Sequence, residues 1–275
     1  GIRDKLVTGV QTCALPISLS RPAGVACASC HQAQQAYQGN NGSSIAAFAR
    51  GAAPNTLGKR NTPTVMYASF SPPFSFVEER DVKTGHREMI PIGGQFFDGR
   101  AATLTEQVKG PLFDPNEMNA ASKKDVVAAI RSGPYAELLR HVFGAHIFNN
   151  DNDAFLKISQ AVAAFESSSR FHPFSSKFDD YLQGKGELTP QELEGFKLFK
   201  DPKKGNCLSC HVGNETSHNP QDWLFTDYTY DALGGPKYQR ARSASKPDLG
   251  LCAQPGLAKK MPFQDRKSTR LNSSH

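Results

Sequence analysis

Two short stretches of the chain combine a pair of cysteines with a histidine. The first is Cys27-Ala28-Ser29-Cys30-His31, and the second is Cys207-Leu208-Ser209-Cys210-His211. In such a C-x-x-C-H pattern, two thiols three positions apart can reach the two vinyl groups of one porphyrin, and the next residue places an imidazole under the iron. The pattern therefore predicts two covalently bound haem c groups, with Cys27, Cys30, Cys207 and Cys210 forming the thioether bonds and His31 and His211 ligating the irons.

A C-x-x-C pair is not specific to haem. Such a pair also occurs in zinc sites and in thioredoxin-like redox motifs. A zinc site would gather four ligands from two pairs, and a redox pair is expected after a strand in a βαβ unit, which neither stretch has. Because each pair is followed directly by His, we favour haem, and thiols destined for thioether bonds predict maturation outside the cytoplasm.

Both ends of the chain are identified as a sequencing adapter translated in frame, at residues 7–17 and 265–275. We therefore set aside 1–18 and 265–275 as non-native flanks and expect 19–264 to be a biological fragment that lacks its C-terminal part. Without the flanks, 27 basic and 24 acidic side chains leave a net charge of +3 instead of +6. This composition predicts no nucleic-acid partner, and no stretch has the length of a membrane span.

Helical patterns dominate between and around the two motifs. Capping boxes predict helix starts at Thr103 and at Thr189, the second with Pro190 at the first helical position. We expect Pro111 to end the first of these helices. Short helices are predicted at 126–131 and 135–143, and the apolar spacing from 155 to 165 predicts a buried helical stripe, formed by Phe155, Ile158, Val162 and Phe165.

The composition of the remaining segments predicts long loops between the helices. Residues 39–59 read as a surface loop, 71–94 as an insertion or flap, and 171–186 as the connection between two domains. We therefore predict a mainly α fold with two cytochrome c-like haem domains, an N-terminal one at 19–168 and an incomplete C-terminal one at 169–264.

Six further motifs lie between the two C-x-x-C-H stretches. They are Arg60-Asn61-Thr62-Pro63-Thr64, Phe97-Asp98-Gly99-Arg100-Ala101, Glu106-Gln107, Glu117-Met118, Ala163-Ala164-Phe165-Glu166 and Phe178-Asp179-Asp180-Tyr181. In order and spacing the chain resembles the bacterial di-haem cytochrome c peroxidases and their MauG relatives, from about residue 19 to about residue 227.

This resemblance implies a periplasmic enzyme that reduces hydrogen peroxide to water at the N-terminal haem. Electrons from a small cytochrome c or copper protein would enter through the C-terminal haem. Glu117 would be the acid/base that moves a proton during O–O cleavage, and Gln107 would help to hold peroxide. Asn61 would belong to an inter-domain calcium site. The resemblance leaves a homodimer open.

Two positions depart from the family pattern. The loop 39–59 carries no His that could act as a distal ligand, so we expect the N-terminal haem to be open without prior reduction. Phe97 stands where the family usually has Trp, which puts fast electron hopping by that route in doubt. Within the flap, His86 and Met89 are the candidates for a sixth iron ligand. The sole tryptophan, Trp223, is expected to be buried or at an interface.

Two other functions stay open from the sequence. One is a MauG-like oxidase of a protein substrate, and the other is a non-catalytic di-haem electron carrier. The residue expected to separate peroxidase from oxidase, the distal ligand of the C-terminal haem, would lie in the missing tail. Without the haem motifs, Glu117 would read as a solvated carboxylate, Gln107 as helix surface and Asn61 as a turn cap.

Overall fold

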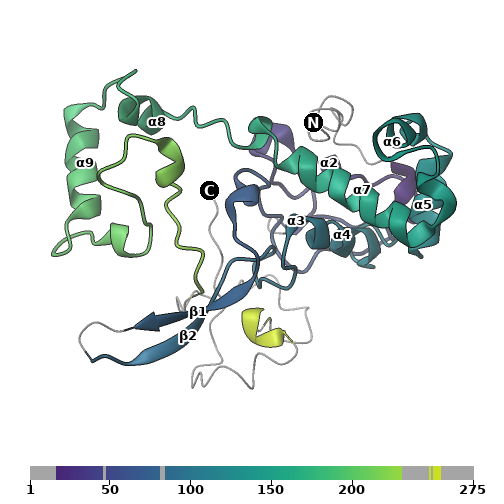
Figure 1. Ribbon diagram of the computed structural model, residues 1–275, viewed down its shortest axis with the longest axis horizontal. Coiled ribbons are helices and arrows are strands. Elements are labelled where there is room, and N and C mark those ends of the chain that lie inside the picture. The colour runs from purple at the N-terminus through teal and green to yellow at the C-terminus, as the bar shows by residue number, and fades with distance from the viewer. Residues whose placement is uncertain (1–16, 46–47, 81–83, 231–247, 249, 255–275) are drawn as a thin grey trace.

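The computed structural model describes residues 17–45, 48–80, 84–230, 248 and 250–254 (Figure 1). Over these residues the fold is mainly helical with one small sheet, which confirms the predicted fold class. The expected flanks lie outside the described residues at 1–16 and 265–275. None of the described helices has the length and apolar character needed to cross a membrane.

Three helices form one end of the molecule, at the right of Figure 1: α5 Lys123–Arg131, α6 Ala136–Phe143 and α7 Asp151–Glu166. Side-chain oxygens of Ser122 and Asn150 accept from backbone N–H groups at the starts of α5 and α7, which satisfies donors that the helix itself leaves unpaired. The predicted apolar stripe of α7 is buried at all four positions, namely Phe155, Ile158, Val162 and Phe165.

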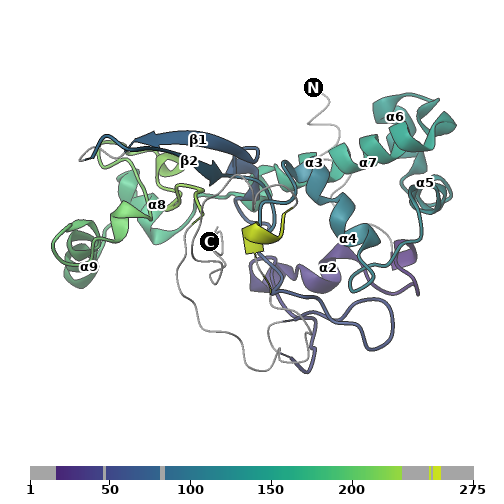
Figure 2. The ribbon, with the colours of Figure 1, turned by 90° about the horizontal axis from the view of Figure 1, so that it is seen from below.

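Two short helices, α3 Leu104–Gln107 and α4 Lys109–Phe113, follow each other beside α7 (Figure 2). Helix α3 packs on α7 without a buried residue of its own, and Leu112 of α4 belongs to the core. Thr103 caps α3 by accepting from the N–H of Glu106, which is one half of the predicted capping box. The Glu106 carboxylate does not return the second bond and pairs with Lys109 at 2.6 Å instead. The expectation that Pro111 ends a helix is wrong. It occupies the first turn of α4, where a missing N–H removes no intrahelical hydrogen bond.

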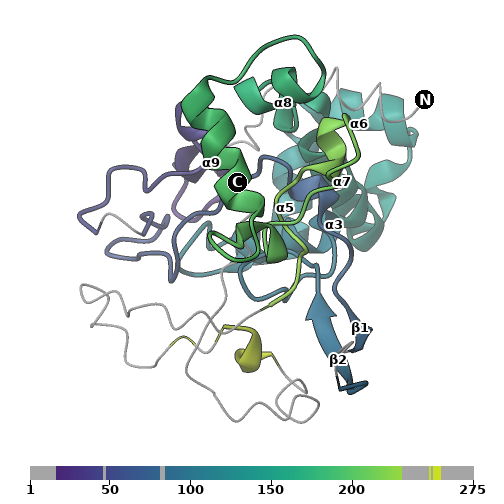
Figure 3. The ribbon, with the colours of Figure 1, turned by 90° about the vertical axis from the view of Figure 1, so that its left-hand side faces the viewer.

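The predicted flap is a β-hairpin. Strands β1 Ser75–Arg80 and β2 Arg87–Ile92 are antiparallel, with Ser75 opposite Ile92 and Arg80 opposite Arg87. Figure 3 shows the hairpin projecting away from the helices. At its base, Gly93 donates to the carbonyl oxygen of Tyr228 over 2.9 Å, and the Tyr230 hydroxyl donates to that of Gly93 over 2.6 Å.

Helices α8 Lys177–Leu182 and α9 Pro190–Lys200 lie at the opposite end from α5 and α6 (Figures 1 and 2). The predicted capping box is present, since Thr189 and Glu192 each bond the backbone of the other. Trp223 is buried as expected, in a cluster with Phe178, Phe196 and Phe225.

The packing partner of the chain changes within the predicted connection 171–186. Phe171 is fully buried against Phe165 of α7 and Tyr37. Phe178 packs instead on the aromatic cluster around Trp223; this cluster, α8 and α9 are called the C-terminal unit below. The division into domains at 168/169 stays a prediction. Short 3-10 helices occur at Ile17–Leu19, Ala33–Gln35, Ala68–Phe70, Ile147–Asn149, Ser169–Phe171, Cys207–Ser209, Pro220–Asp222 and Gly250–Ala253.

Candidate functional site

The first C-x-x-C-H motif forms a single helical turn, α2 Cys27–Cys30. The N–H of His31 closes it by donating to the carbonyl oxygen of Cys27 over 2.9 Å, and Ser29 Oγ accepts from the N–H of Ala26 over 3.1 Å. Residues three apart on a helical turn share one face. The two thiols are thus presented together, with His31 directly after them.

The backbone orients the His31 ring. Its Nδ1 atom lies 2.9 Å from the carbonyl oxygen of Tyr37, and the backbone of Pro63 is a second hydrogen-bond partner of the ring. Because a carbonyl can only accept, the contact with Tyr37 favours a proton on Nδ1, the arrangement usual for a metal-ligating histidine. Burial lowers the pKa of His31 and favours the neutral ring. The imidazole is prepared to act as a ligand.

The second motif repeats this arrangement with different local structure. Cys207–Ser209 form a 3-10 turn, and the N–H of His211 donates to the carbonyl oxygen of Cys207 over 2.8 Å. His211 Nδ1 lies 3.0 Å from the carbonyl oxygen of Phe225. As at His31, a backbone carbonyl thus faces Nδ1, the contact usual for the ring nitrogen that does not ligate a metal.

The donor sets fit haem c at both places, because each combines two neighbouring thiols with an imidazole whose Nδ1 is occupied by a backbone carbonyl. Across the described part of the chain, no three His, Cys, Asp or Glu side chains gather as ligands for a metal ion. Calcium at the exposed Asn61 stays a prediction.

Glu117 follows His31 by 86 positions, yet its charge acts on Cys30 of the first motif. The loop 114–119 after α4 is tied to chain segments on both sides of the motif. Ala52 donates to the carbonyl oxygen of Glu117 over 2.7 Å, and Arg21 donates to that of Met118 over 2.9 Å. These backbone bonds hold the loop of Glu117 against segments that precede and follow the first motif, and its role as acid/base stays a prediction.

The surroundings of Glu117 disfavour its charged form. Burial, and then the negative charge of Asp114, raise its pKa, while Arg100 and Lys59 act in the opposite direction. The negative charge of Glu117 also acts on Cys30 in the first motif. The pKa of the Cys30 thiol is raised to about 11, mainly by burial and further by Glu117. A half-buried carboxyl with a raised pKa can both accept and return a proton.

The other predicted residues are less clearly placed. Gln107 is half-buried at the end of α3, and its contact with peroxide stays a prediction. His86 and Met89 are exposed in the hairpin, so their role as iron ligands also stays a prediction. Phe97 is half-buried, and its position between two haems is likewise untested.

Sequence reasoning missed an ion-pair network that joins two of the motifs. Asp98 is 5% exposed and pairs with Arg60 over 2.8 Å and with Arg100 over 2.9 Å. Arg60 also binds both carboxylate oxygens of Asp248, at 2.5 and 2.7 Å. The only sequence signal was the presence of opposite charges in neighbouring motifs, which does not specify which groups pair.

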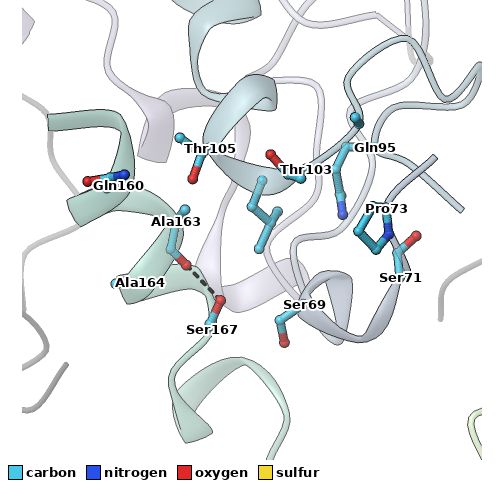
Figure 4. A pocket seen from close by; sticks show the side chains of 12 residues that line it. Ser69, Ser71, Pro73, Gln95, Thr103, Thr105, Gln160, Ala163, Ala164 and Ser167 are labelled. Atoms are coloured by element: carbon cyan, nitrogen blue, oxygen red, sulfur yellow. Dashed lines mark hydrogen bonds between the residues drawn. The ribbon is translucent and has the colours of Figure 1, made fainter. Parts of the chain in front are cut away.

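An open cleft of about 390 Å³ lies elsewhere, between α3, α7 and the base of the hairpin (Figure 4). Its walls are hydroxyl, amide and small apolar side chains, from Ser69, Ser71, Pro73, Gln95, Ala102, Thr103, Leu104, Thr105, Gln160, Ala163, Ala164 and Ser167. None of the predicted site residues lines it, so the cleft is not the haem-binding turn.

Comparisons with known proteins agree with these features. A sequence model of the di-haem cytochrome c peroxidase family matches residues 17–187. The methylamine utilization protein MauG of Paracoccus denitrificans is 33% identical over 247 residues, which cover 87% of this chain and 60% of that protein. The cytochrome c peroxidase Ccp of Escherichia coli is 32% identical, over 77% of this chain and 39% of that protein.

A solved structure shares the fold as well. The diheme peroxidase BthA from Burkholderia thailandensis superimposes with a TM-score of 0.79 at 32% identity, covering 98% of this chain and 64% of that chain. The present chain thus spans less than two thirds of the length of these relatives.

Proposed function

The chain belongs to the di-haem cytochrome c peroxidase family, and from this premise we propose that it is part of a peroxidase that reduces hydrogen peroxide to water. The observation that carries the proposal is that the loop of Glu117 is bonded to the segments on both sides of the first C-x-x-C-H turn, and the charge of Glu117 acts on Cys30 within it. Electron transfer alone requires no proton transfer, so a non-catalytic electron carrier would not need a carboxyl with a raised pKa near the first motif.

Residues of both motifs would hold the cofactors. Cys27 and Cys30 would form the thioether bonds of one haem c and His31 Nε2 would ligate its iron, with Cys207, Cys210 and His211 serving the second. The haems would supply the redox chemistry, in which two electrons and two protons convert hydrogen peroxide into two molecules of water.

Glu117 would move the proton that makes O–O cleavage favourable. Its carboxylate takes a proton from one oxygen of hydrogen peroxide and returns it to the other, which leaves as water. The raised pKa of Glu117 suits the first step, because it makes the carboxylate a stronger base than an ordinary glutamate. Gln107 would hold peroxide in place by hydrogen bonding.

The C-terminal haem would accept electrons from a small cytochrome c or copper protein and pass them to the N-terminal haem. We expect the protein in the periplasm, because thioether maturation takes place outside the cytoplasm, and Asn61 would contribute to a calcium site. A second candidate is a MauG-like oxidase of a protein substrate, favoured by the 33% identity with MauG. Both candidates use the same peroxide chemistry at Glu117.

The test is rapid mixing of the haem-loaded chain with hydrogen peroxide while the haem absorption spectrum is followed. We expect a fast spectral change that Glu117→Gln slows about 100-fold or more. Glu106→Gln is the matched control, since Glu106 is exposed and pairs with Lys109 at 2.6 Å. Equal rates in wild type and Glu117→Gln would contradict the acid/base role, and haems indifferent to peroxide would leave an electron carrier.

A further inference from the structure

The cleft between α3, α7 and the base of the hairpin has no part in the proposed function, since none of the residues that line it belongs to either C-x-x-C-H motif. Its volume of about 390 Å³ lies in the range of pockets that hold small molecules. Figure 4 shows side chains of α7 on one side and those of Ser71, Pro73 and Gln95 on the other. A molecule bound here would contact both the helix and the base of the hairpin.

Hydrogen bonds within the walls give the cleft a defined shape. Gln95 is only 9% exposed, and its Nε2 atom donates to the carbonyl oxygen of Ala68 over 3.1 Å. On the opposite wall, the Ser167 hydroxyl donates to the carbonyl oxygen of Ala163 over 2.7 Å, as Figure 4 shows. Because the protein itself satisfies these donors, the walls need no ligand to hold them in place.

Other polar groups of the lining are free to bond a ligand. Among the residues that the structure describes, the hydroxyls of Ser69 and Thr105 have no hydrogen-bond partner. Gln160 Oε1 accepts from Lys157 Nζ over 3.2 Å, and the amide nitrogen of Gln160 has no partner in the same part of the chain. A hydroxyl can donate and accept, and an amide nitrogen donates. The cleft therefore offers both kinds of hydrogen-bonding group, from three separate segments.

The lining also determines which charge and shape a ligand can have. All twelve lining residues are neutral. A charged ligand would lose part of its hydration in the cleft without gaining an ionic partner, which is costly. Apolar surface comes from Ala163 and Ala164 of α7 and from Pro73 across the cleft (Figure 4). An uncharged molecule with flat apolar faces and polar groups at its edge matches these walls.

We propose that this cleft is a binding site for a small uncharged aromatic molecule that carries hydroxyl or amide groups. Its ring lies between Pro73 and the alanines of α7, and its polar groups bond Ser69, Thr105 and Gln160. A rigid ring suits such a site, because it loses little conformational freedom on binding. The inference goes beyond the proposed function, since binding here requires no reaction with hydrogen peroxide.

The test is a calorimetric titration of the haem-loaded chain with two probes of nearly equal shape. One is 4-hydroxybenzamide, which is neutral, and the other is 4-hydroxybenzoate, which is an anion at neutral pH. We expect 4-hydroxybenzamide to bind saturably, with one molecule per chain. The affinity for 4-hydroxybenzoate should be lower by roughly tenfold or more, because the cleft offers its charge no partner.

Two variants locate the site. Ala164→Leu fills the cleft from α7 and should abolish binding of 4-hydroxybenzamide, whereas Ala128→Leu makes the same change at a half-buried position of α5 outside the cleft and should leave binding unchanged. Thr105→Val keeps the shape of the side chain, removes the hydroxyl and should weaken binding about fivefold. It serves as the test if Ala164→Leu does not fold.

Three results would overturn the proposal. They are the absence of saturable binding, equal affinities for the two probes, and unchanged binding in Ala164→Leu or in Thr105→Val. The titration contains no hydrogen peroxide, so its outcome is separate from that of the proposed function.

Discussion

The backbone N–H of Ala52 donates to the carbonyl oxygen of Glu117 over 2.7 Å. The two loops can meet this closely because the preceding residue is Gly51. A Cβ at Gly51 would lie 2.2 Å from the carbonyl oxygen of Asn116, a distance that no real side chain tolerates. The missing side chain of Gly51 therefore lets the loop that carries Glu117 lie against the segment that follows the first motif.

Replacing Gly51 by alanine should displace Glu117 from the haem-binding turn. The added methyl group meets backbone atoms, which cannot rotate away as a flexible side chain can. We expect the rate constant of the reaction with hydrogen peroxide to fall roughly tenfold or more, since small misplacements of a catalytic group are costly. Rapid mixing of the haem-loaded variant with peroxide measures this rate.

Gly58→Ala is the matched control for Gly51→Ala. A Cβ at Gly58 would have its nearest neighbours at 3.7 Å, an ordinary van der Waals contact. The control should therefore react as the wild type does. Equal rates in the two variants would show that the contact between Gly51 and Asn116 does not position Glu117.

Phe97→Trp should speed electron transfer between the two haems. Tryptophan can be oxidised transiently and relay an electron, whereas phenylalanine is much harder to oxidise. Transient absorption after rapid reduction of one haem measures the inter-haem rate. Phe143→Trp, at the end of α6, adds a tryptophan elsewhere and should change nothing. An unchanged rate in Phe97→Trp would mean that position 97 only packs.

Features that depend on neighbouring residues were predictable from the sequence. Thr103 and Thr189 cap helices as their spacing indicated, and the apolar stripe beginning at Phe155 is buried. These depend on residues within one or two turns of each other. The C-x-x-C-H motifs belong to the same class, because the three residues predicted to bind one haem lie within five consecutive positions.

Features that depend on distant contacts were not predictable in the same way. The sequence of the hairpin indicated a flap, because its strands carry many charged residues at exposed positions. Its base is bonded to Tyr228 and Tyr230, which lie far along the chain. The pairing of Arg60 with Asp98 and Asp248 is likewise a product of the fold. Placing Glu117 at the first motif required the family resemblance, since the spacing alone indicated a solvated carboxylate.

Thr189→Ala should destabilise the C-terminal unit. The Thr189 hydroxyl accepts a hydrogen bond from the N–H of Glu192, and the Glu192 carboxylate accepts one from the N–H of Thr189 over 2.7 Å. Losing such a cap costs about 1 kcal/mol. Chemical denaturation, followed by the fluorescence of Trp223, should show the loss. Thr189→Ser keeps the hydroxyl and should keep most of the stability, and equal losses in both variants would rule out capping as the cause.

Glu166 should make the protein less stable as the pH rises. Its Oε2 atom is buried and, among the described residues, has no hydrogen-bond partner, and burial raises the pKa of Glu166 to about 7. In the unfolded chain a glutamate has a pKa of about 4.3. Between these values the folded state binds more protons than the unfolded state, so stability is full below the unfolded pKa and is lost as the pH rises through the folded one.

The loss from this one group is on the order of 3 kcal/mol when the pH rises from about 5 to about 8. Glu166→Gln carries no titrating proton, so its free energy of unfolding should change less over that range, and its advantage over the wild type should grow with pH. Denaturant unfolding at both pH values measures the difference. Glu187→Gln, at an exposed carboxyl, is the control and should follow the wild type. Parallel pH profiles for wild type and Glu166→Gln would mean that Glu166 finds a partner that keeps it charged in the folded state.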